Sequence, residues 1–173
     1  MQLNDIFQDK TLKQKTKVEM ISDLVMDKKM NLDELINFAG KTREIEKATC
    51  IESIEFATKK QATIATEKCL KFITKSLTDN APRVKWESAK VIGNIASLFS
   101  TNKLKPVIKE LLVNSENKGT VVRWATAYAL GEIVKLKTDL NKELIPAIES
   151  ICAREGDTGV KKKYLEALKK AKK

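Results

Sequence analysis

A segment of the chain repeats with a period of 38 residues. The sequence VKWESAKVIGNI starts at Val84, VRWATAYALGEI starts at Val122, and VKKKYLEALKKA starts at Val160. Apolar or small residues recur at fixed offsets from each leading valine, which in the second segment give Thr126, Ala127, Ala129, Leu130 and Ile133. This spacing places them on one face of an α-helix. One such helix cannot bury its apolar face alone, so the period predicts a stack of repeats.

Shorter apolar patterns between these helices predict a second helix in each repeat. They run over residues 104–112 and 144–152, with Pro106 and Pro146 at matching places, each expected in the first turn of its helix. Upstream periodicity predicts two further pairs of helices, at 12–27 with 32–39 and at 44–57 with 63–77. One more predicted helix, at 158–171, follows the last pair. The sequence therefore predicts nine helices.

The predicted fold class is all-α, a right-handed α–α superhelix (solenoid) of about four helical hairpins plus a terminal helix. Six glycines and three prolines in 173 residues leave few turns for a β-fold. We expect a single repeat domain over residues 1–173, with approximate repeats at 10–40, 41–78, 79–116 and 117–156 and the terminal helix at 157–173.

The stretch from 77 to 95 resembles the HEAT-repeat pattern of an acidic residue, a proline, a Val-Arg pair, small residues and a closing Leu-Gly. The residues at these places are Asp79, Pro82, Val84, Lys85, Ser88, Ala89, Ile92 and Gly93. The next copy matches with Val122, Arg123, Thr126, Ala127, Leu130 and Gly131, but it departs from the pattern at Asn117 and Thr120. The resemblance covers residues 77–168.

This resemblance implies a structural role for the basic residues that recur at one repeat position, namely Lys85, Arg123 and Lys161. In the family, such groups bridge to acidic or carbonyl groups of the neighbouring repeat, and Asp79 and Glu155 stand at the matching acidic positions. A ligand-binding role for the same basic residues is the alternative.

The chain contains no histidine, which excludes Ser-His-Asp and Cys-His catalysis within it and removes the commonest transition-metal ligand. Cys50, Cys69 and Cys152 form no CxxC pair and lie among apolar helical positions, so we expect buried free thiols. Gly93 and Gly131 lie in no phosphate-binding motif, and are expected to allow close helix contact. The sequence thus predicts no catalytic residue, no metal site and no cofactor, and we expect a protein that is not an enzyme.

The two tryptophans, Trp86 and Trp124, hold equivalent places one repeat apart, and four residues further on come Lys90 and Tyr128. These four side chains are expected to point away from the main core face of their helices. They form either a packed groove between repeats or an aromatic patch for a partner, because aromatic residues with flanking cations are frequent in interface hot spots.

Lysines form a second candidate surface. The net charge is +10, of which the segment 161–173, with seven lysines and one glutamate, carries +6. This segment is either a polar cap on the array or a basic arm. A further stripe falls on one face of each second helix, which we expect to line the concave surface: Lys68, Lys71, Lys75, Lys105 and Lys109. The stripe is either a solvated face or a groove for an acidic peptide or a phosphate backbone.

The function that these features favour is a non-enzymatic HEAT-like scaffold for protein–protein interaction, with an unidentified and conceivably acidic protein partner. Nucleic-acid binding through a basic concave face is the alternative. HEAT-like DNA alkylation-repair glycosylases are disfavoured, because Lys90 and Tyr128 stand where a carboxylate would be needed. No apolar leader or membrane segment is evident, so we expect a cytoplasmic protein away from membranes. The oligomeric state is open, and apolar exposure around Ile6 and Phe7 would favour end-to-end association.

Overall fold

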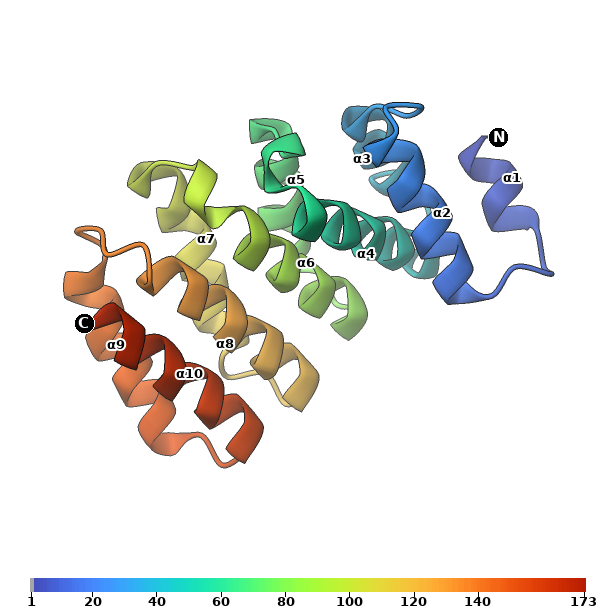
Figure 1. Cartoon of the computed structure of the whole chain (residues 1–173). Helices are drawn as coiled ribbons and strands as arrows, with labels where there is room; N and C mark the ends of the chain where they lie inside the picture. Colours follow the sequence, from blue (N-terminus) through green and yellow to red (C-terminus); the bar gives the residue numbers. More distant parts are fainter. Residues whose placement is uncertain (1) are drawn as a thin grey trace.

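The computed structural model describes residues 2–173, which form ten α-helices and two short 3₁₀ turns, with no strand in that range (Figure 1). The helices are Leu3–Gln8 (α1), Gln14–Met26 (α2), Leu32–Ala39 (α3), Glu44–Lys60 (α4), Glu67–Ser76 (α5), Pro82–Ile95 (α6), Thr101–Asn114 (α7), Thr120–Val134 (α8), Asn141–Arg154 (α9) and Thr158–Ala171 (α10). The turns, Ala62–Ile64 and Ala96–Leu98, follow α4 and α6. The predicted all-α solenoid is confirmed.

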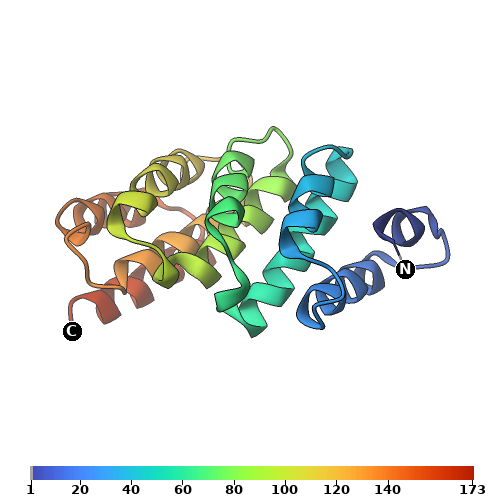
Figure 2. The ribbon, with the colours of Figure 1, turned by 90° about the horizontal axis from the view of Figure 1, so that it is seen from above.

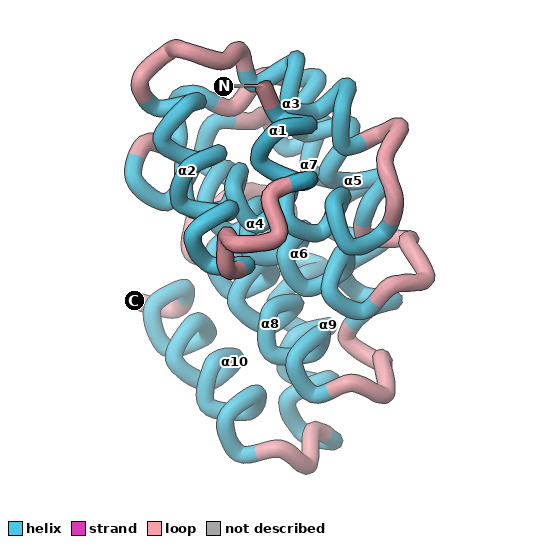
Figure 3. Tube along the Cα trace, turned by 90° about the vertical axis from the view of Figure 1, so that its right-hand side faces the viewer, coloured by secondary structure: helices cyan, strands magenta, loops and turns pink. Residues whose placement is uncertain are grey.

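The helices succeed one another along a single direction, so that the two ends of the chain lie at opposite ends of the molecule (Figure 2). They form two layers, which we call inner (α2, α4, α6, α8, α10) and outer (α3, α5, α7, α9). Loops join the layers at each turn of the solenoid (Figure 3). One continuous cluster of buried apolar residues runs between the layers from Leu3 to Leu168. None of the described helices combines the length and the apolarity that crossing a membrane requires.

The two layers are packed differently. Each inner helix makes extensive contact with the next, most of all α6 with α8, whereas α5 barely touches α7. Each of α3, α5, α7 and α9 makes its broader contact with the inner helix that follows it. In a curved stack of two layers, the layer whose helices lie closer together is the concave one. The prediction that the second helix of each hairpin lines the concave surface is therefore wrong, because these helices form the looser layer.

Small residues allow the close approach of the inner helices. The side of Gly93 in α6 is covered by the ring of Tyr128 from α8, so that a Cβ at this position would collide with the ring. Gly131 in α8 faces Ala167 in α10, where a Cβ would lie 3.0 Å from the Ala167 Cβ. The expectation that the two glycines bring neighbouring helices together is thus confirmed.

Local sequence signals fix where several helices begin. The Asn31 side chain accepts a hydrogen bond from the Asp33 amide, and the Glu34 carboxylate accepts one from the Asn31 amide, which is a capping box at the start of α3. Thr66 caps α5 and Asp157 caps α10 through their side-chain oxygens. Pro106 and Pro146 lie inside α7 and α9, beyond the first turn where they were predicted, because both helices begin earlier than their apolar patterns.

The prediction of nine helices is wrong by one, because α1 precedes the expected array. This helix of six residues is too short for its periodicity to be recognised in the sequence. Ile6 is fully buried, and the ring of Phe7 stacks on Phe38 with 5.4 Å between ring centroids. The predicted apolar exposure at Ile6 and Phe7 is therefore also wrong, since α1 turns its apolar side onto the neighbouring helices.

Basic side chains of the inner helices bind acidic and carbonyl groups at the ends of neighbouring outer helices, which is the kind of contact that the HEAT resemblance implied. The Arg123 guanidinium donates to both carboxylate oxygens of Glu155 at 2.9 and 3.2 Å and to the Asn117 carbonyl at 2.9 Å. Lys85 donates to the Leu77 carbonyl at 3.2 Å and to the Asn114 side chain at 3.0 Å. Within residues 2–173, Lys161 makes no ion pair, so its bridging role stays a prediction.

The series of basic residues at this repeat position begins one repeat earlier than predicted, at Lys47, which lies 38 residues before Lys85. Its ammonium pairs with Asp79 at 2.7 Å. Partial burial acts to raise the pKa of Asp79, but the hydrogen bonds from Lys47 and the Ala81 amide outweigh it and hold the pKa below its ordinary value. The same balance, with Arg123 and the Asp157 amide as donors, lowers the pKa of Glu155.

Candidate partner-binding surface

Side chains at equivalent repeat positions form a row across the inner layer. On α6 the partly exposed stripe includes Trp86, Lys90 and Asn94, and on α8 it includes Trp124 and Tyr128. These residues recur every three or four positions, so each set lies on one side of its helix. The structure thus places all four predicted residues of the aromatic set on the inner layer, where neighbouring helices are in direct contact.

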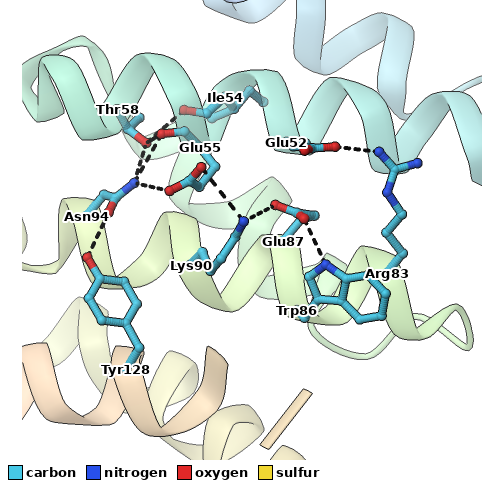
Figure 4. Close-up of polar contacts among 10 residues, drawn as sticks. All are labelled: Glu52, Ile54, Glu55, Thr58, Arg83, Trp86, Glu87, Lys90, Asn94 and Tyr128. Carbon is cyan, nitrogen blue, oxygen red and sulfur yellow. Dashed lines mark hydrogen bonds and ion pairs between the residues drawn. The ribbon is translucent and has the colours of Figure 1, made fainter. Parts of the chain in front are cut away.

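Lys90 lies between two buried carboxylates (Figure 4). Its ammonium nitrogen is 2.8 Å from Glu87 Oε2 and 3.8 Å from Glu55 Oε2, and the two glutamates are only 4% and 6% exposed. The indole nitrogen of Trp86 donates to Glu87 Oε1 at 2.7 Å. Both Trp86 and Lys90 are therefore held within the molecule, which limits what they offer to a partner.

Asn94 joins three helices through one side chain (Figure 4). Its amide nitrogen donates to the Glu55 carbonyl and to the Thr58 hydroxyl, each at 3.2 Å, and its amide oxygen accepts from the Tyr128 hydroxyl at 2.8 Å. Nearby, Arg83 of α6 pairs with Glu52 of α4. These contacts lock α4, α6 and α8 in register, because each polar group is satisfied by a group on another helix.

Burial changes the pKa values of two groups in this network, Glu87 and Tyr128. It raises the pKa of Glu87, although the charge and hydrogen bond of Lys90 oppose the change. Burial also raises the pKa of Tyr128 to about 12, with the negative charges of Glu132 and Glu55 adding to the effect. The Tyr128 phenol is therefore a neutral donor near pH 7, which suits its hydrogen bond to Asn94.

Trp124 is the exposed aromatic side chain of the row. It is 37% exposed and stacks on Tyr128 with 6.4 Å between ring centroids, while the Lys163 ammonium of α10 lies 4.9 Å from the centre of its ring. Val121, one turn earlier on α8, is 54% exposed. Trp124 and Val121 thus present apolar surface beside a cation, in a geometry that favours a cation–π contact.

The structure does not place the predicted lysines with the aromatic residues. Lys68, Lys71 and Lys75 belong to α5, and the remaining two of the set, Lys105 and Lys109, belong to α7, so all five lie in the outer layer. Lys68 is 3.6 Å from Asp33. The expectation of a basic concave face built from these lysines is wrong, because the concave layer is made of the other helices.

Several residues of the inner surface were missed by sequence reasoning. They are Glu55, Glu87 and Asn94, of which Glu87 follows Trp86 directly and accepts a hydrogen bond from its indole. Lys163 approaches Trp124, whereas its neighbour Lys162 lies 3.9 Å from Glu166 on its own helix. Spacing gave the helix face, but it did not specify which of two adjacent lysines reaches the ring.

The three cysteines are free and buried, as predicted. Burial raises the pKa of the Cys50 and Cys69 thiols to about 12, so neither is a thiolate near pH 7. Residues 2–173 contain no group of three or more His, Cys, Asp or Glu side chains that could hold a metal ion.

Comparison with solved structures assigns the fold. A designed armadillo repeat protein in complex with the peptide (KR)4 is 20% identical over 89% of this chain and 69% of that chain, with a TM-score of 0.69. The complex of CpcE and CpcF of phycocyanin lyase from Nostoc sp. PCC7120 is 18% identical over 95% of this chain and 94% of that chain, with a TM-score of 0.71. Computationally designed armadillo repeat proteins for modular peptide recognition are 17% identical over 97% and 80% of the two chains, with a TM-score of 0.70.

No protein-family model matches the chain, and no curated protein matches it either. The likeness therefore rests on architecture, at identities that show the fold alone. The chain has an all-α repeat fold of the armadillo/HEAT-like solenoid type. Its repeats carry the HEAT-type basic residues, and consecutive helical hairpins form its solenoid.

Proposed function

We propose that this protein is a non-enzymatic scaffold that binds a segment of a partner protein on its inner surface, with Trp124 as the main contact residue. The observation that carries the proposal is the exposed stack of Trp124 on Tyr128, flanked by Val121 and the Lys163 ammonium. Large aromatic residues beside cations are frequent among the residues that dominate binding energy at protein interfaces.

The rest of the row supports this role by holding the surface rigid. Lys90, Asn94 and Tyr128 are engaged in contacts between helices, so the binding surface is formed before a partner arrives. A preformed surface loses less conformational entropy on binding. The proposal thus assigns positioning roles to Trp86, Lys90 and Tyr128 and the direct contact to Trp124.

Two proteins of similar fold bind other chains. One designed armadillo repeat protein is in complex with the peptide (KR)4, and CpcE is in complex with CpcF. On the inner layer, Arg83 pairs with Glu52, and Lys90 pairs with the buried Glu55 and Glu87. The proposal therefore rests on the apolar surface of Trp124 and Val121, which suits a segment of a partner protein. The proposal includes a cytoplasmic setting, which three free, buried thiols support.

Selection of binding peptides tests the proposal. A random peptide library is displayed against the immobilised full chain, and the affinities of the enriched peptides are measured for the wild type and for Trp124→Ala. We expect Trp124→Ala to weaken binding by about 30-fold, the loss of about 2 kcal/mol typical of a hot-spot residue.

Val113→Ala is the matched control, because Val113 is an exposed apolar residue on α7 of the outer layer. Its removal is expected to leave the affinity unchanged. Peptides that bind Trp124→Ala as tightly as the wild type, or that lose as much affinity with Val113→Ala, would contradict the proposal.

A further inference from the structure

A groove opens in the outer layer between α5 and α7, on the opposite layer from Trp124. It has a volume of about 530 Å³, and its surface is mainly apolar. Leu70 and Thr74 of α5, Thr78 just after α5, and Pro106 of α7 line it. Charged side chains from both helices stand along the same lining. Apolar surface with charged edges is the usual anatomy of a site that takes an amphipathic segment.

The groove follows from the difference between the two layers. α5 packs on α6, and α7 packs on α8, while α6 and α8 lie close together. Because the solenoid curves toward the inner layer, the outer helices are farther apart and make little contact with each other. The groove is thus part of the folded architecture and requires no rearrangement to open.

The charges along the groove are unevenly distributed between its walls. Lys71 and Lys75 stand four residues apart on α5, and neither makes an ion pair with any residue in 2–173. On the α7 wall, Lys103 is paired with Glu67 of α5, which leaves Glu110 as the acidic group of that wall. The α5 edge is therefore basic and the α7 edge acidic.

We propose that this groove binds an amphipathic α-helix of a partner protein, with an apolar stripe facing Leu70 and Pro106 and an acidic edge facing Lys71 and Lys75. Two carboxylates spaced by one helical turn match two lysines with the same spacing. Glu67 and Glu110 line the same groove and disfavour a nucleic-acid backbone in it. This site is separate from the proposed contact at Trp124 and does not depend on it.

Lys105 and Lys109 provide an internal comparison. They lie on α7, but neither of them lines the groove, whose α7 wall is formed by Lys103, Pro106 and Glu110. They are exposed and make no ion pair within the described part of the chain. Reversing their charge changes the net charge by the same amount as reversing Lys71 and Lys75 while leaving the groove intact.

The test uses a synthetic helical peptide of about 16 residues, with leucine at every third or fourth position and glutamate along one edge. Its binding to the full chain is measured by fluorescence anisotropy in parallel with a scrambled peptide of equal composition. We expect the amphipathic peptide to bind at least about tenfold more tightly than the scrambled one, because only the former presents a continuous apolar stripe.

Charge reversal then tests the orientation. Lys71→Glu/Lys75→Glu should weaken binding by about tenfold or more, and a peptide with lysine in place of the edge glutamates should regain it. Lys105→Glu/Lys109→Glu should change the affinity by less than about threefold. Thr74→Trp, which fills the groove with a ring, should abolish binding while the thermal unfolding transition is retained.

Four results would overturn the proposal. These are equal binding of the scrambled peptide, equal loss with both pairs of charge reversals, unchanged binding to Thr74→Trp, and failure of the lysine-edged peptide to bind the reversed groove. If heparin or duplex DNA, tested alongside, competes with the peptide and loses its own binding with Lys71→Glu/Lys75→Glu, the groove is a polyanion site, which also contradicts the proposal.

Discussion

The inner and outer layers are both built from amphipathic helices, yet they present different surfaces. In α6 and α8 the buried residues occupy most of the helix circumference, because each helix contacts neighbours on both sides as well as the outer layer. In α7 the buried set is a single stripe of Leu104, Val107, Leu111 and Asn114. The width of the buried face therefore distinguishes the layers, and it is visible in the sequence as the small residues of the inner helices.

This difference determines where the molecule offers binding surface. The inner layer is closely packed, and its polar groups are engaged between helices, so it exposes a few fixed side chains such as Trp124. The outer layer leaves space between its helices, as at the groove between α5 and α7. Substitutions that act on one layer and spare the other should make this difference measurable.

The largest effect is expected at Gly93, where α6 and α8 meet. Gly93→Ala should lower the free energy of unfolding by about 2 kcal/mol, because a collision with the Tyr128 ring outweighs the helix propensity gained. Gly131→Ala, whose Cβ would meet only the Ala167 methyl at 3.0 Å, should change it by less than about 1 kcal/mol. Urea unfolding measures both, and equal effects would contradict the account.

A double-mutant cycle sharpens that result. In a Tyr128→Ala background, Gly93→Ala should no longer be destabilising, because the colliding ring is gone. If the cost of Gly93→Ala is the same in both backgrounds, the ring is not its cause.

Loss of the Asn94 side chain should have the next largest effect. Asn94→Leu removes the acceptor of the Tyr128 hydroxyl and the donor to the Glu55 carbonyl, and we expect a loss of about 1.5 kcal/mol in unfolding free energy. Tyr128→Phe removes only one of these hydrogen bonds, so it should cost less. Chemical denaturation of both variants checks the order, and a larger cost for Tyr128→Phe would be inconsistent with the network.

The basic residues between repeats should contribute less, and in a pH-dependent way. Arg123→Met should lower the unfolding free energy at pH 7 by about 1 kcal/mol, because it leaves Glu155 without its bidentate partner. Lys47→Met, which removes a single, partly buried ion pair with Asp79, should cost less, about 0.5 kcal/mol.

The sign of the pH dependence follows from the lowered pKa of Glu155 in the folded state. The stabilisation by its carboxylate is present above the unfolded-state pKa of about 4.3 and is lost as the pH falls through the lower folded-state value. The stability difference between the wild type and Arg123→Met should therefore shrink from pH 7 to pH 3. A difference that is constant with pH would exclude this ion pair as its source.

The smallest effect is expected in the outer layer. Lys105→Glu/Lys109→Glu should change the free energy of unfolding by no more than about 0.5 kcal/mol, because both side chains are exposed and unpaired within residues 2–173. Thermal unfolding of the variant beside the wild type tests this. A large loss would mean that the outer surface contributes contacts that the structure does not show.

Sequence periodicity predicted most of the helices, because a buried stripe must recur with the helical period. It missed α1, which is too short for a period to be seen, although Leu3 and Ile6 are its buried residues. Lys47 could have been found, since it precedes Lys85 by the same 38 residues. The assignment of the concave layer could not be made from spacing, because both layers have amphipathic helices and only their contacts reveal the curvature.

The two tryptophans show the limit of repeat equivalence for the candidate site. Trp86 is followed by Glu87, which accepts its indole hydrogen bond, whereas Trp124 is followed by Ala125, which has no acceptor. Trp124 instead stacks on Tyr128 below Lys163. The residue next to each tryptophan, not its position in the repeat, decides which ring is available to a partner.

Native-state hydrogen exchange tests the central claim, the difference between the layers, most directly. We expect the amides of α6 and α8 to exchange with a free energy close to that of global unfolding, and those of α5 and α7 to exchange through openings of lower free energy, because the outer helices have fewer neighbours. Equal protection in the two layers, or greater protection in α5 and α7, would contradict the account.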